Sequence, residues 1–329
     1  MIRGKILFVS DECYYYSQGL TVFKKNIYSK EVSTFIKLPA RILDSFVSRQ
    51  HLLSRLFRSQ VHHMVDDGQG GFFIVFLKRI VKVDSLGNIV GVVASLVGSR
   101  PLCVTVYNGK LLFGEYTNNS ERKSVGIYSF NGNGLELVCS VNGVRHIHGV
   151  FVDDTDKSIY VTTGDYGDEA GIWKLDYDSA KLQPIYIGGQ QARAVELLFD
   201  ESSIYFGTDT PLEKNYIYKL DKKTRNVVPI SDVSSSVFYA KKRNKKFYFG
   251  TVAEPSQVNT QKALELWEVY DGNAKLINTF DKDIWSMKYF QYGQIVFPNY
   301  SMSSKTSELW FYQLATKKSG VSNFIVSKK

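Results

Sequence analysis

The stretch from Arg145 to Glu169 has a basic cluster at its start and an acidic cluster at its end. Its pattern predicts two strands joined by a tight turn. In an antiparallel pair, the start of one strand lies beside the end of the next. We therefore expect the two clusters to meet at one end of this hairpin. The basic cluster contains Arg145, His146 and His148, and the acidic cluster contains Asp165, Asp168 and Glu169.

The two histidines share one face of their strand, because side chains alternate with a period of two. Such a pair supports proton transfer or substrate hydrogen bonding near neutral pH, a structural role, or metal binding with a third ligand such as Asp165 or Gln191. We expect no cofactor, and a divalent metal remains the minor alternative. Glu115, Asp165 and Glu169 are candidates for catalysis by carboxylates, with His146 and His148 beside them.

The elements around this hairpin repeat from residue 61 onwards, with a period of roughly 40–50 residues that is typical of propellers and solenoids. The second strands of the units read GFFIVF, KLLFGEY, SIYVTTGD, SIYFGTDT, KFYFGTVAE and QIVFPNYS, and the third strands read IVKVD, VGIYSF, GIWKLD, YIYKLD, LELWEVYD and ELWFYQL. Four short strands per unit predict an all-β protein, a β-propeller. Seven blades is the expected count, and six is the alternative.

The N-terminal region supplies the seventh blade. Strands are expected at Ile6–Ser10, Gly19–Asn26 and Ser33–Leu38, with the innermost strand of this blade missing and Ser322–Lys328 available as a closing strand. Tyr14–Tyr16 is placed in a connection, as a hydrophobic plug or a sugar-stacking surface. Residues 40–58 predict one long helix whose apolar stripe packs on the β-domain. We expect one domain over residues 1–329, with this helix as an insertion.

In a propeller, the loop that enters the first strand of a blade and the loop that leaves the second share one face. Three consecutive blades place an arginine at the first position: Arg100, Arg145 and Arg193. The same blades place acids or amides at the second position, where the second strand ends. His62 and His63 begin the first strand of the preceding blade. The arginines are either structural ion pairs or a cluster that binds a carboxylate. The second position holds Glu115, Asn118, Asp165, Glu169, Asp209 and Asn215.

Composition narrows the classes of partner. The formal net charge is +9, which favours an anionic partner, but the basic residues are dispersed and no nucleic-acid-binding motif is present. An acidic saccharide therefore fits best. The three cysteines are widely spaced, the apolar run at the N-terminus is too short for a signal peptide, and no segment reaches transmembrane length. We expect a cytoplasmic protein without membrane insertion, whose oligomeric state the sequence leaves open.

The motifs SRPL, GEYTNN, VRHIHG, GDYGDE, QQARAV and TDTPLEKN, between Arg100 and Asn215, resemble those of the sialidase-like (BNR-repeat) propeller proteins often encoded with bacterial surface-polysaccharide genes. The resemblance implies that Arg100, Arg145 and Arg193 form the arginine triad that sialidases use for the sugar carboxylate. It also makes Tyr300 in FPNYS the candidate for the sialidase tyrosine, by its place at the end of a second strand.

The leading hypothesis is a glycan-processing enzyme of polysaccharide metabolism that acts on an acidic saccharide. As a glycoside hydrolase it would use Asp165 or Glu169 as the acid, and as a polysaccharide lyase it would use a histidine or tyrosine as the base. The alternative is a non-catalytic glycan-binding or assembly propeller, since one fold serves many functions. A protein-interaction propeller is a third possibility, and whether the protein is an enzyme stays open.

Overall fold

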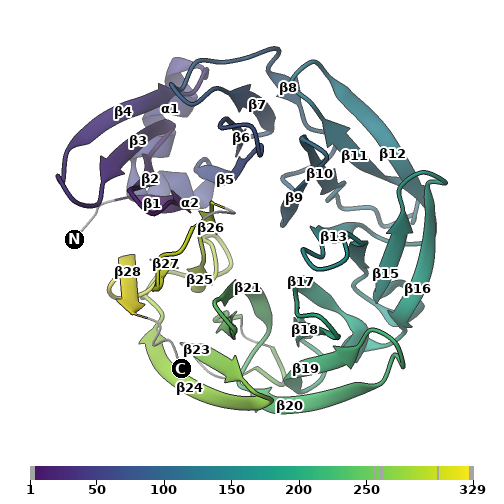
Figure 1. Ribbon diagram of the computed structural model, residues 1–329. Coiled ribbons are helices and arrows are strands. Elements are labelled where there is room, and N and C mark those ends of the chain that lie inside the picture. Colours follow the sequence, from purple (N-terminus) through teal and green to yellow (C-terminus); the bar gives the residue numbers. More distant parts are fainter. Residues whose placement is uncertain (1–3, 255, 260–261, 302–303, 326–329) are drawn as a thin grey trace.

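The computed structural model describes residues 4–254, 256–259, 262–301 and 304–325, and these form seven sheets arranged in a ring (Figure 1). The seven-blade prediction is confirmed and the six-blade alternative is excluded. The first blade consists of β1 (Lys5–Val9), β2 (Cys13–Gln18), β3 (Thr21–Asn26) and β4 (Val32–Lys37), and the second of β5 (Val61–Asp66), β6 (Phe72–Phe76), β7 (Arg79–Val83) and β8 (Ala94–Ser95).

The remaining blades follow in chain order. The third contains β9 (Val104–Tyr107), β10 (Lys110–Gly114), β11 (Val125–Phe130) and β12 (Leu135–Val141), and the fourth contains β13 (Ile147–Val152), β14 (Ile159–Thr163), β15 (Gly171–Asp176) and β16 (Lys181–Ile187). The fifth contains β17 (Ala194–Phe199), β18 (Ser203–Thr208), β19 (Asn215–Asp221) and β20 (Val227–Val233), and the sixth contains β21 (Val237–Arg243), β22 (Lys246–Thr251), β23 (Ala263–Tyr270) and β24 (Asn273–Asp281). The seventh contains β25 (Gln294–Val296), β27 (Glu308–Leu314) and β28 (Gly320–Ile325).

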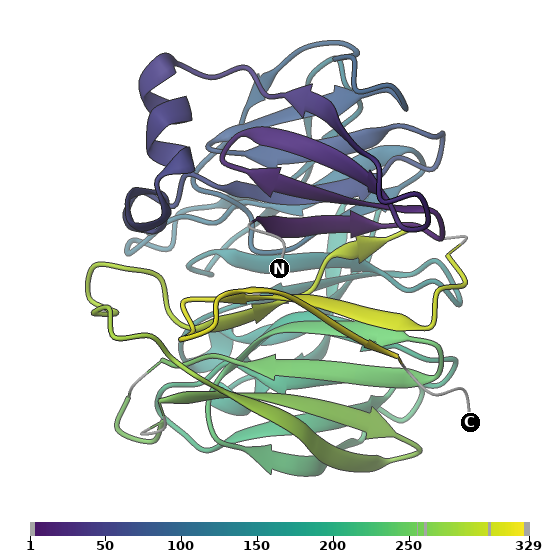
Figure 2. The same ribbon diagram turned by 90° about the vertical axis from the view of Figure 1, so that its left-hand side faces the viewer.

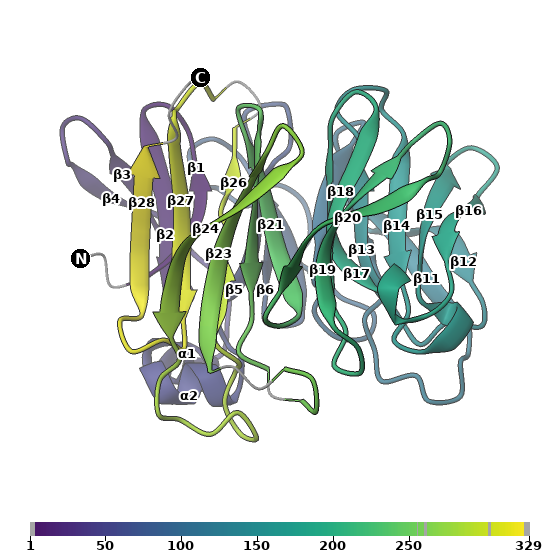
Figure 3. The same ribbon diagram turned by 90° about the horizontal axis from the view of Figure 1, so that it is seen from below.

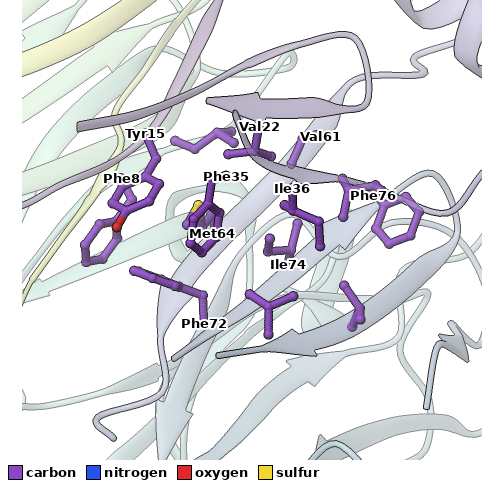
Figure 4. Close-up of a cluster of buried hydrophobic side chains, with 14 of the residues drawn as sticks. Phe8, Tyr15, Val22, Phe35, Ile36, Val61, Met64, Phe72, Ile74 and Phe76 are labelled. Carbon is purple, nitrogen blue, oxygen red and sulfur yellow. The ribbon is translucent and has the colours of Figure 1, made fainter. Parts of the chain in front are cut away.

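The core lies between neighbouring blades, where apolar side chains of facing sheets interdigitate. Figure 4 shows one such layer, in which Phe8, Tyr15 and Phe35 of the first blade pack against Met64 and Phe72 of the second. The second strands are buried on both faces, and for this reason they read as continuous apolar runs.

Glycine ends the second strand where the next blade approaches closely. A Cβ at Gly114 would lie 2.1 Å from the Ile147 side chain of the fourth blade, and one at Gly207 would lie 2.4 Å from Val237 of the sixth. Any larger residue would push the blades apart.

The first blade differs from the prediction in two respects. Tyr14–Tyr16 lies within strand β2 and not in a connection, because its rings are buried on both faces of the sheet: Tyr14 packs on Trp310 and Tyr15 on Phe72. A strand buried on both faces lacks the alternation by which it is recognised. The predicted strand at Ile6–Ser10 is β1, and with β2 the N-terminal segment itself supplies four strands, so the blade does not lack one.

The incomplete blade is the seventh, which has three strands in the described part of the chain. Its strand β25 breaks at Phe297–Pro298, and the chain crosses to the first blade. There β26 (Asn299–Tyr300) pairs in parallel with β1, with Phe8 opposite Asn299 and Val9 opposite Tyr300. The predicted closing strand at the C-terminus is instead the outer strand β28, and residues 326–328 of that prediction lie outside the described residues.

The helical insertion is two short helices, α1 (Ile42–Arg49) and α2 (His51–Leu56), and not one long helix, because Gln50 is in an extended conformation. The expected packing of its apolar stripe is also wrong. Ile42 is 90% exposed and Phe46 is 56% exposed, whereas Arg55 is completely buried. Arg55 forms an ion pair of 2.6 Å with Asp283 and therefore ties α2 to the loop that leads into β25.

Both helices project from one face of the ring, beyond the ends of the sheets (Figures 2 and 3). Arg58, which follows α2, lines the central cavity described below. Neither helix in the described residues is long and apolar enough to cross a membrane.

Candidate functional site

A cavity of about 650 Å³ occupies the middle of the ring. Its size is that of a pocket for a small ligand. The innermost strands supply most of its wall, and residues just beyond the second strands, such as Tyr116, Asp209 and Glu254, complete it.

β-Bulges shape the wall of this cavity. Five of the innermost strands, β1, β5, β13, β17 and β21, shift register against their partners near the start. A bulge adds a residue on one strand and re-aims its side chain. The residues at the five shifts all line the cavity: Leu7, His62, His148, Val195 with Glu196, and Phe238.

The histidines and Asp165 converge at one end of the β13–β14 hairpin. The Nε2 atoms of His146 and His148 are 3.1 Å apart, and they lie 3.4 and 3.3 Å from Asp165 Oδ1. All three side chains are buried, with residue exposures of 4%, 2% and 6%. The Tyr116 ring stacks on His146 at 4.2 Å between ring centroids and separates His146 from the cavity's third-blade side.

Two of the three predicted arginines meet at the same carboxylate. Arg145 lies 3.0 Å from Asp165 Oδ2, and Arg193 lies 3.2 Å from Asp165 Oδ1 and 3.0 Å from Asp209 Oδ2. Burial raises the pKa of Asp165, but its contacts with the His146 and His148 rings and the charge of Arg193 outweigh it and hold this pKa well below its ordinary value. The carboxylate is therefore ionised at all physiological pH values.

Arg100 stands apart, in a cationic group with Lys5 and Arg58 on another part of the wall. Its guanidinium donates to Arg58 O at 2.6 Å and lies 3.1 Å from His62 Nε2. Lys5 Nζ donates to the carbonyls of Val61 and His62. Within the described chain, neither Lys5, Arg58 nor Arg100 forms an ion pair with a carboxylate, so their charges are uncompensated.

Burial and this repulsion lower the pKa values of Lys5 and Arg100. Burial, followed by the charge of Arg100, lowers the pKa of Lys5 to about 8. Burial, followed by the charge of Arg58, lowers the pKa of Arg100 to about 10. The neighbouring His63, whose Nε2 lies 3.0 Å from Pro101 O, has its pKa lowered to about 4 by burial and then by Lys5, and it is neutral at pH 7.

Another part of the wall is acidic. Burial, with the charge of Asp209, raises the pKa of Glu254 to about 7, and the Tyr292 hydroxyl is hydrogen-bonded to the Glu254 carboxyl group. Asp209 is buried, and its Oδ1 has no hydrogen-bond partner in the part of the chain that the structure describes. The cavity thus offers a carboxyl group that is partly protonated near neutral pH, while the acceptor oxygen without a donor is buried in its wall.

Other predicted site residues lie away from the cavity and hold the loops of their blades. Glu115 accepts a hydrogen bond from Gly126 N, and Asn118 accepts one from Arg145. Glu169 is paired with Arg122 at 2.6 Å. Gln191 donates to Glu213 at 2.7 Å, and Asn215 donates to Thr210 O at 2.8 Å.

Tyr300 lines the cavity, but its hydroxyl accepts a hydrogen bond from Trp310 N at 2.8 Å, and the Arg243 guanidinium covers its ring at 4.0 Å. The Tyr300 hydroxyl oxygen is therefore occupied by a hydrogen bond to the seventh blade.

Several residues of the wall were not found from the sequence. Glu254 carried a usable signal, because it ends the second-strand run KFYFGTVAE and follows the end of its strand by three residues, much as Asp165 and Asp209 follow theirs by two and one. Lys5 carried no such signal: it belongs to the N-terminal strand, and it comes near Arg100 only because both contact His62 of the second blade.

Comparisons with known proteins agree on the fold. The chain matches no protein-family model and no curated protein. Two crystal structures of the extracellular domain of BT4673 from B. thetaiotaomicron are similar to it, with TM-scores of 0.58 and 0.62 and identities of 12% and 11% over 97% and 98% of this chain. The chain spans 38% of the length of each. A chain of the mitotic checkpoint complex is similar with a TM-score of 0.55 and 10% identity, over 84% of this chain and 76% of that one.

At these identities the likeness establishes the propeller fold alone. The BT4673 structures come from the extracellular part of a signalling system, and no sialidase-like protein is among these matches. The function must therefore be argued from the cavity itself.

Proposed function

We propose that the central cavity binds an acidic saccharide and that the protein cleaves it. The observation that carries this proposal is the group of Lys5, Arg58 and Arg100, three cations on one cavity wall without a carboxylate partner. Buried charges are normally paired, because desolvation of an isolated charge is expensive. A ligand carboxylate supplies the missing partner, and arginine presents the fork of donors that a carboxylate fits.

The acidic wall supports cleavage of the glycosidic bond by hydrolysis. Glu254, with its pKa raised to about 7, is suited to act as a general acid that gives its proton to the leaving oxygen. Asp209, which lines the cavity, is suited to take a proton from the attacking water. The bond from the anomeric carbon to the leaving oxygen breaks as the bond to water forms, and the two protons pass to and from these carboxyl groups.

The second candidate is a binding propeller without turnover. It is favoured by the ion pairs of Asp165 and Asp209 with arginines, since neither carboxylate is free as a nucleophile. Elimination beside a uronic acid is the other cleavage reaction that the cationic wall would assist, because the cations acidify the neighbouring C–H. Its product is distinguishable, since it contains a conjugated double bond that absorbs in the ultraviolet.

The test is calorimetric titration of the protein with uronic and nonulosonic oligosaccharides, followed by analysis of the products. We expect one of them to bind, and Arg100→Ala to weaken its binding about 10- to 100-fold, because the buried charge-assisted hydrogen bonds are lost. Arg49→Ala, which removes the same charge from the exposed end of α1, is the matched control and should bind as the wild type does.

The outcomes separate the candidates. Turnover by the wild type that Glu254→Gln abolishes, with binding retained, supports the hydrolase. Binding without turnover supports the binding propeller. If no acidic saccharide binds, or if Arg100→Ala binds as well as the wild type, the proposal is wrong.

A further inference from the structure

The hydrogen bonds of His146 and His148 determine which ring nitrogens carry protons. His146 Nδ1 lies 3.0 Å from Thr117 O, and His148 Nδ1 lies 2.9 Å from Ala194 O. A backbone carbonyl can only accept a hydrogen bond, so each Nδ1 carries hydrogen. In the neutral rings both Nε2 atoms are then unprotonated acceptors, and they face each other.

A third acceptor completes the group. Asp165 Oδ1 lies 3.3 Å from one Nε2 and 3.4 Å from the other, and the two Nε2 atoms are separated by 3.1 Å. Three lone-pair donors of similar separation thus point at a common centre in a buried environment. Such an arrangement is unfavourable unless a cation occupies the centre.

The size of this triangle fits a metal ion. Tetrahedral coordination with nitrogen and oxygen ligands at about 2.0 Å requires ligand atoms about 3.3 Å apart. The alternative cation is a shared proton. A proton would draw one pair of atoms to about 2.7–2.9 Å, the length of a charge-assisted hydrogen bond, and leave the third atom further away. The three nearly equal separations favour the metal.

We propose that His146, His148 and Asp165 form a binding site for a divalent first-row transition metal ion. Two imidazoles and one carboxylate suit zinc, iron or manganese, and imidazole argues against calcium and magnesium. The carbonyl contacts of both Nδ1 atoms are the outer contacts that typically orient metal-binding histidines. Three protein ligands leave a coordination position open.

The surrounding charges are mixed. Arg145 and Arg193 both contact Asp165, and their positive charges oppose a divalent ion. Asp209 pairs with Arg193, and Glu254 lies on the same acidic wall, so the neighbourhood also supplies negative charge. The metal affinity will therefore be lower than that of a site without arginines.

The open position gives this site a possible part in cleavage, a point that rests on the function proposed above. His148 and Asp209 both line the cavity, and Asp209 Oδ1 lacks a donor. A water molecule on the metal would be acidified by it, and Asp209 is available to accept its proton.

The experiment is metal binding to the full chain after treatment with a chelator, measured with Zn²⁺, Mn²⁺ and Co²⁺ by equilibrium dialysis and elemental analysis. We expect one ion per chain, a rise in melting temperature with added Zn²⁺, and a Co²⁺ absorption spectrum of low coordination number. His146→Ala and His148→Ala should each weaken the affinity by more than about a hundredfold, because loss of an outer contact alone costs 10- to 100-fold.

The matched control is His63→Gln, which replaces another buried histidine of the cavity wall outside the triangle and should retain the metal. The proposal is overturned if the folded wild type binds none of the three ions. In that case His146, His148 and Asp165 share a proton. It is also overturned if His148→Ala binds metal as the wild type does. The wild-type measurement decides the question even where a variant fails to fold, and it does not depend on any saccharide.

Discussion

Asp165 is contacted by four cationic or potentially cationic side chains: Arg145, Arg193, His146 and His148. The carboxylate is therefore the centre around which the fourth and fifth blades position their polar residues. Because its pKa is held low, its charge is constant over the physiological pH range. The pH-dependent behaviour of the cavity must come from other groups, above all Lys5 and Glu254.

Lys5 should make the binding of an acidic saccharide depend on pH. Its pKa of about 8 in the free protein means that it loses its charge as the pH rises above 8. A bound carboxylate favours the charged form, so binding takes up a proton at high pH. We expect the affinity to fall between pH 8 and pH 9.5 and to stay nearly constant in Lys5→Arg. Calorimetry in buffers of different ionisation enthalpy measures this proton uptake, and equal uptake in both proteins would contradict the prediction.

Glu254 should reduce the stability of the folded protein at alkaline pH. Its pKa is raised from 4.5 to about 7, so the folded state binds a proton that the unfolded state has lost between these values. The contribution of this group to the free energy of unfolding is fully present below pH 4.5 and is lost as the pH rises through 7. Glu254→Gln should therefore be more stable than the wild type by about 2–3 kcal/mol at pH 8 and similar to it at pH 4. Urea titrations at both values provide the comparison, and a pH-independent difference would argue against this assignment.

At the scale of elements, bulges and one buried arginine position the cavity wall. The bulges direct residues such as His62 and His148 inward, while Arg55 fixes α2 to the loop that supplies Tyr292. The ion pair and a hydrogen bond from Arg55 to Gln291 O thus join α2 to a loop that is distant in the sequence.

Replacement of Arg55 should loosen this contact. Asp283 would lose its buried partner and keep Lys282 and the Trp285 backbone N–H, each at 3.1 Å. Breaking a buried pair costs about 3–5 kcal/mol. We expect Arg55→Met to raise hydrogen exchange in residues 42–57 and 282–291 and to leave the fifth blade unchanged. Arg41→Ala, which removes an exposed pair with Asp44, should have little effect on exchange. Global unfolding of Arg55→Met would show that the contact stabilises the whole ring.

The sequence predicted the repeated strands well because their signal is local. Runs such as SIYFGTDT contain both the strand and the residue that follows it, and hairpins join neighbours in the chain. Helix packing was mispredicted since periodicity identifies an apolar face but not what covers it. The exposed Ile42 and Phe46 show this difference. The proximity of Arg100 and Lys5 was not predicted, because no local sequence pattern indicates that residues so far apart in the chain lie close together.

At the scale of the molecule, Asn299 joins three blades across the closure. Its backbone pairs with β1, its Nδ2 donates to Met64 O at 3.1 Å, and its Oδ1 accepts from Lys241 at 3.3 Å. The position of each group depends on the ring being closed. Closure also covers the inner edge of β1 with β26, and an open strand edge there would promote aggregation.

Asn299→Ala should destabilise the protein by about 1–3 kcal/mol, because it leaves the Met64 carbonyl and the Lys241 ammonium without these partners. Denaturant unfolding of the full chain measures this change. Asn133→Ala, at an exposed turn of the third blade, is the control and should change the stability by less than about 0.5 kcal/mol. Equal stabilities of the two variants would show that the Asn299 side chain does not support closure.

The pairing of β1 with β26 also determines how long β1 lacks its inner partner during synthesis. Strand β1, with Phe8 and Val9, leaves the ribosome well before its inner neighbour, which contains Asn299 and Tyr300. At 5–20 residues per second, β26 is synthesised roughly fifteen seconds to a minute after β1. During this time the first blade exposes an unpaired inner edge, so the interval of synthesis is the period in which this protein most needs a chaperone.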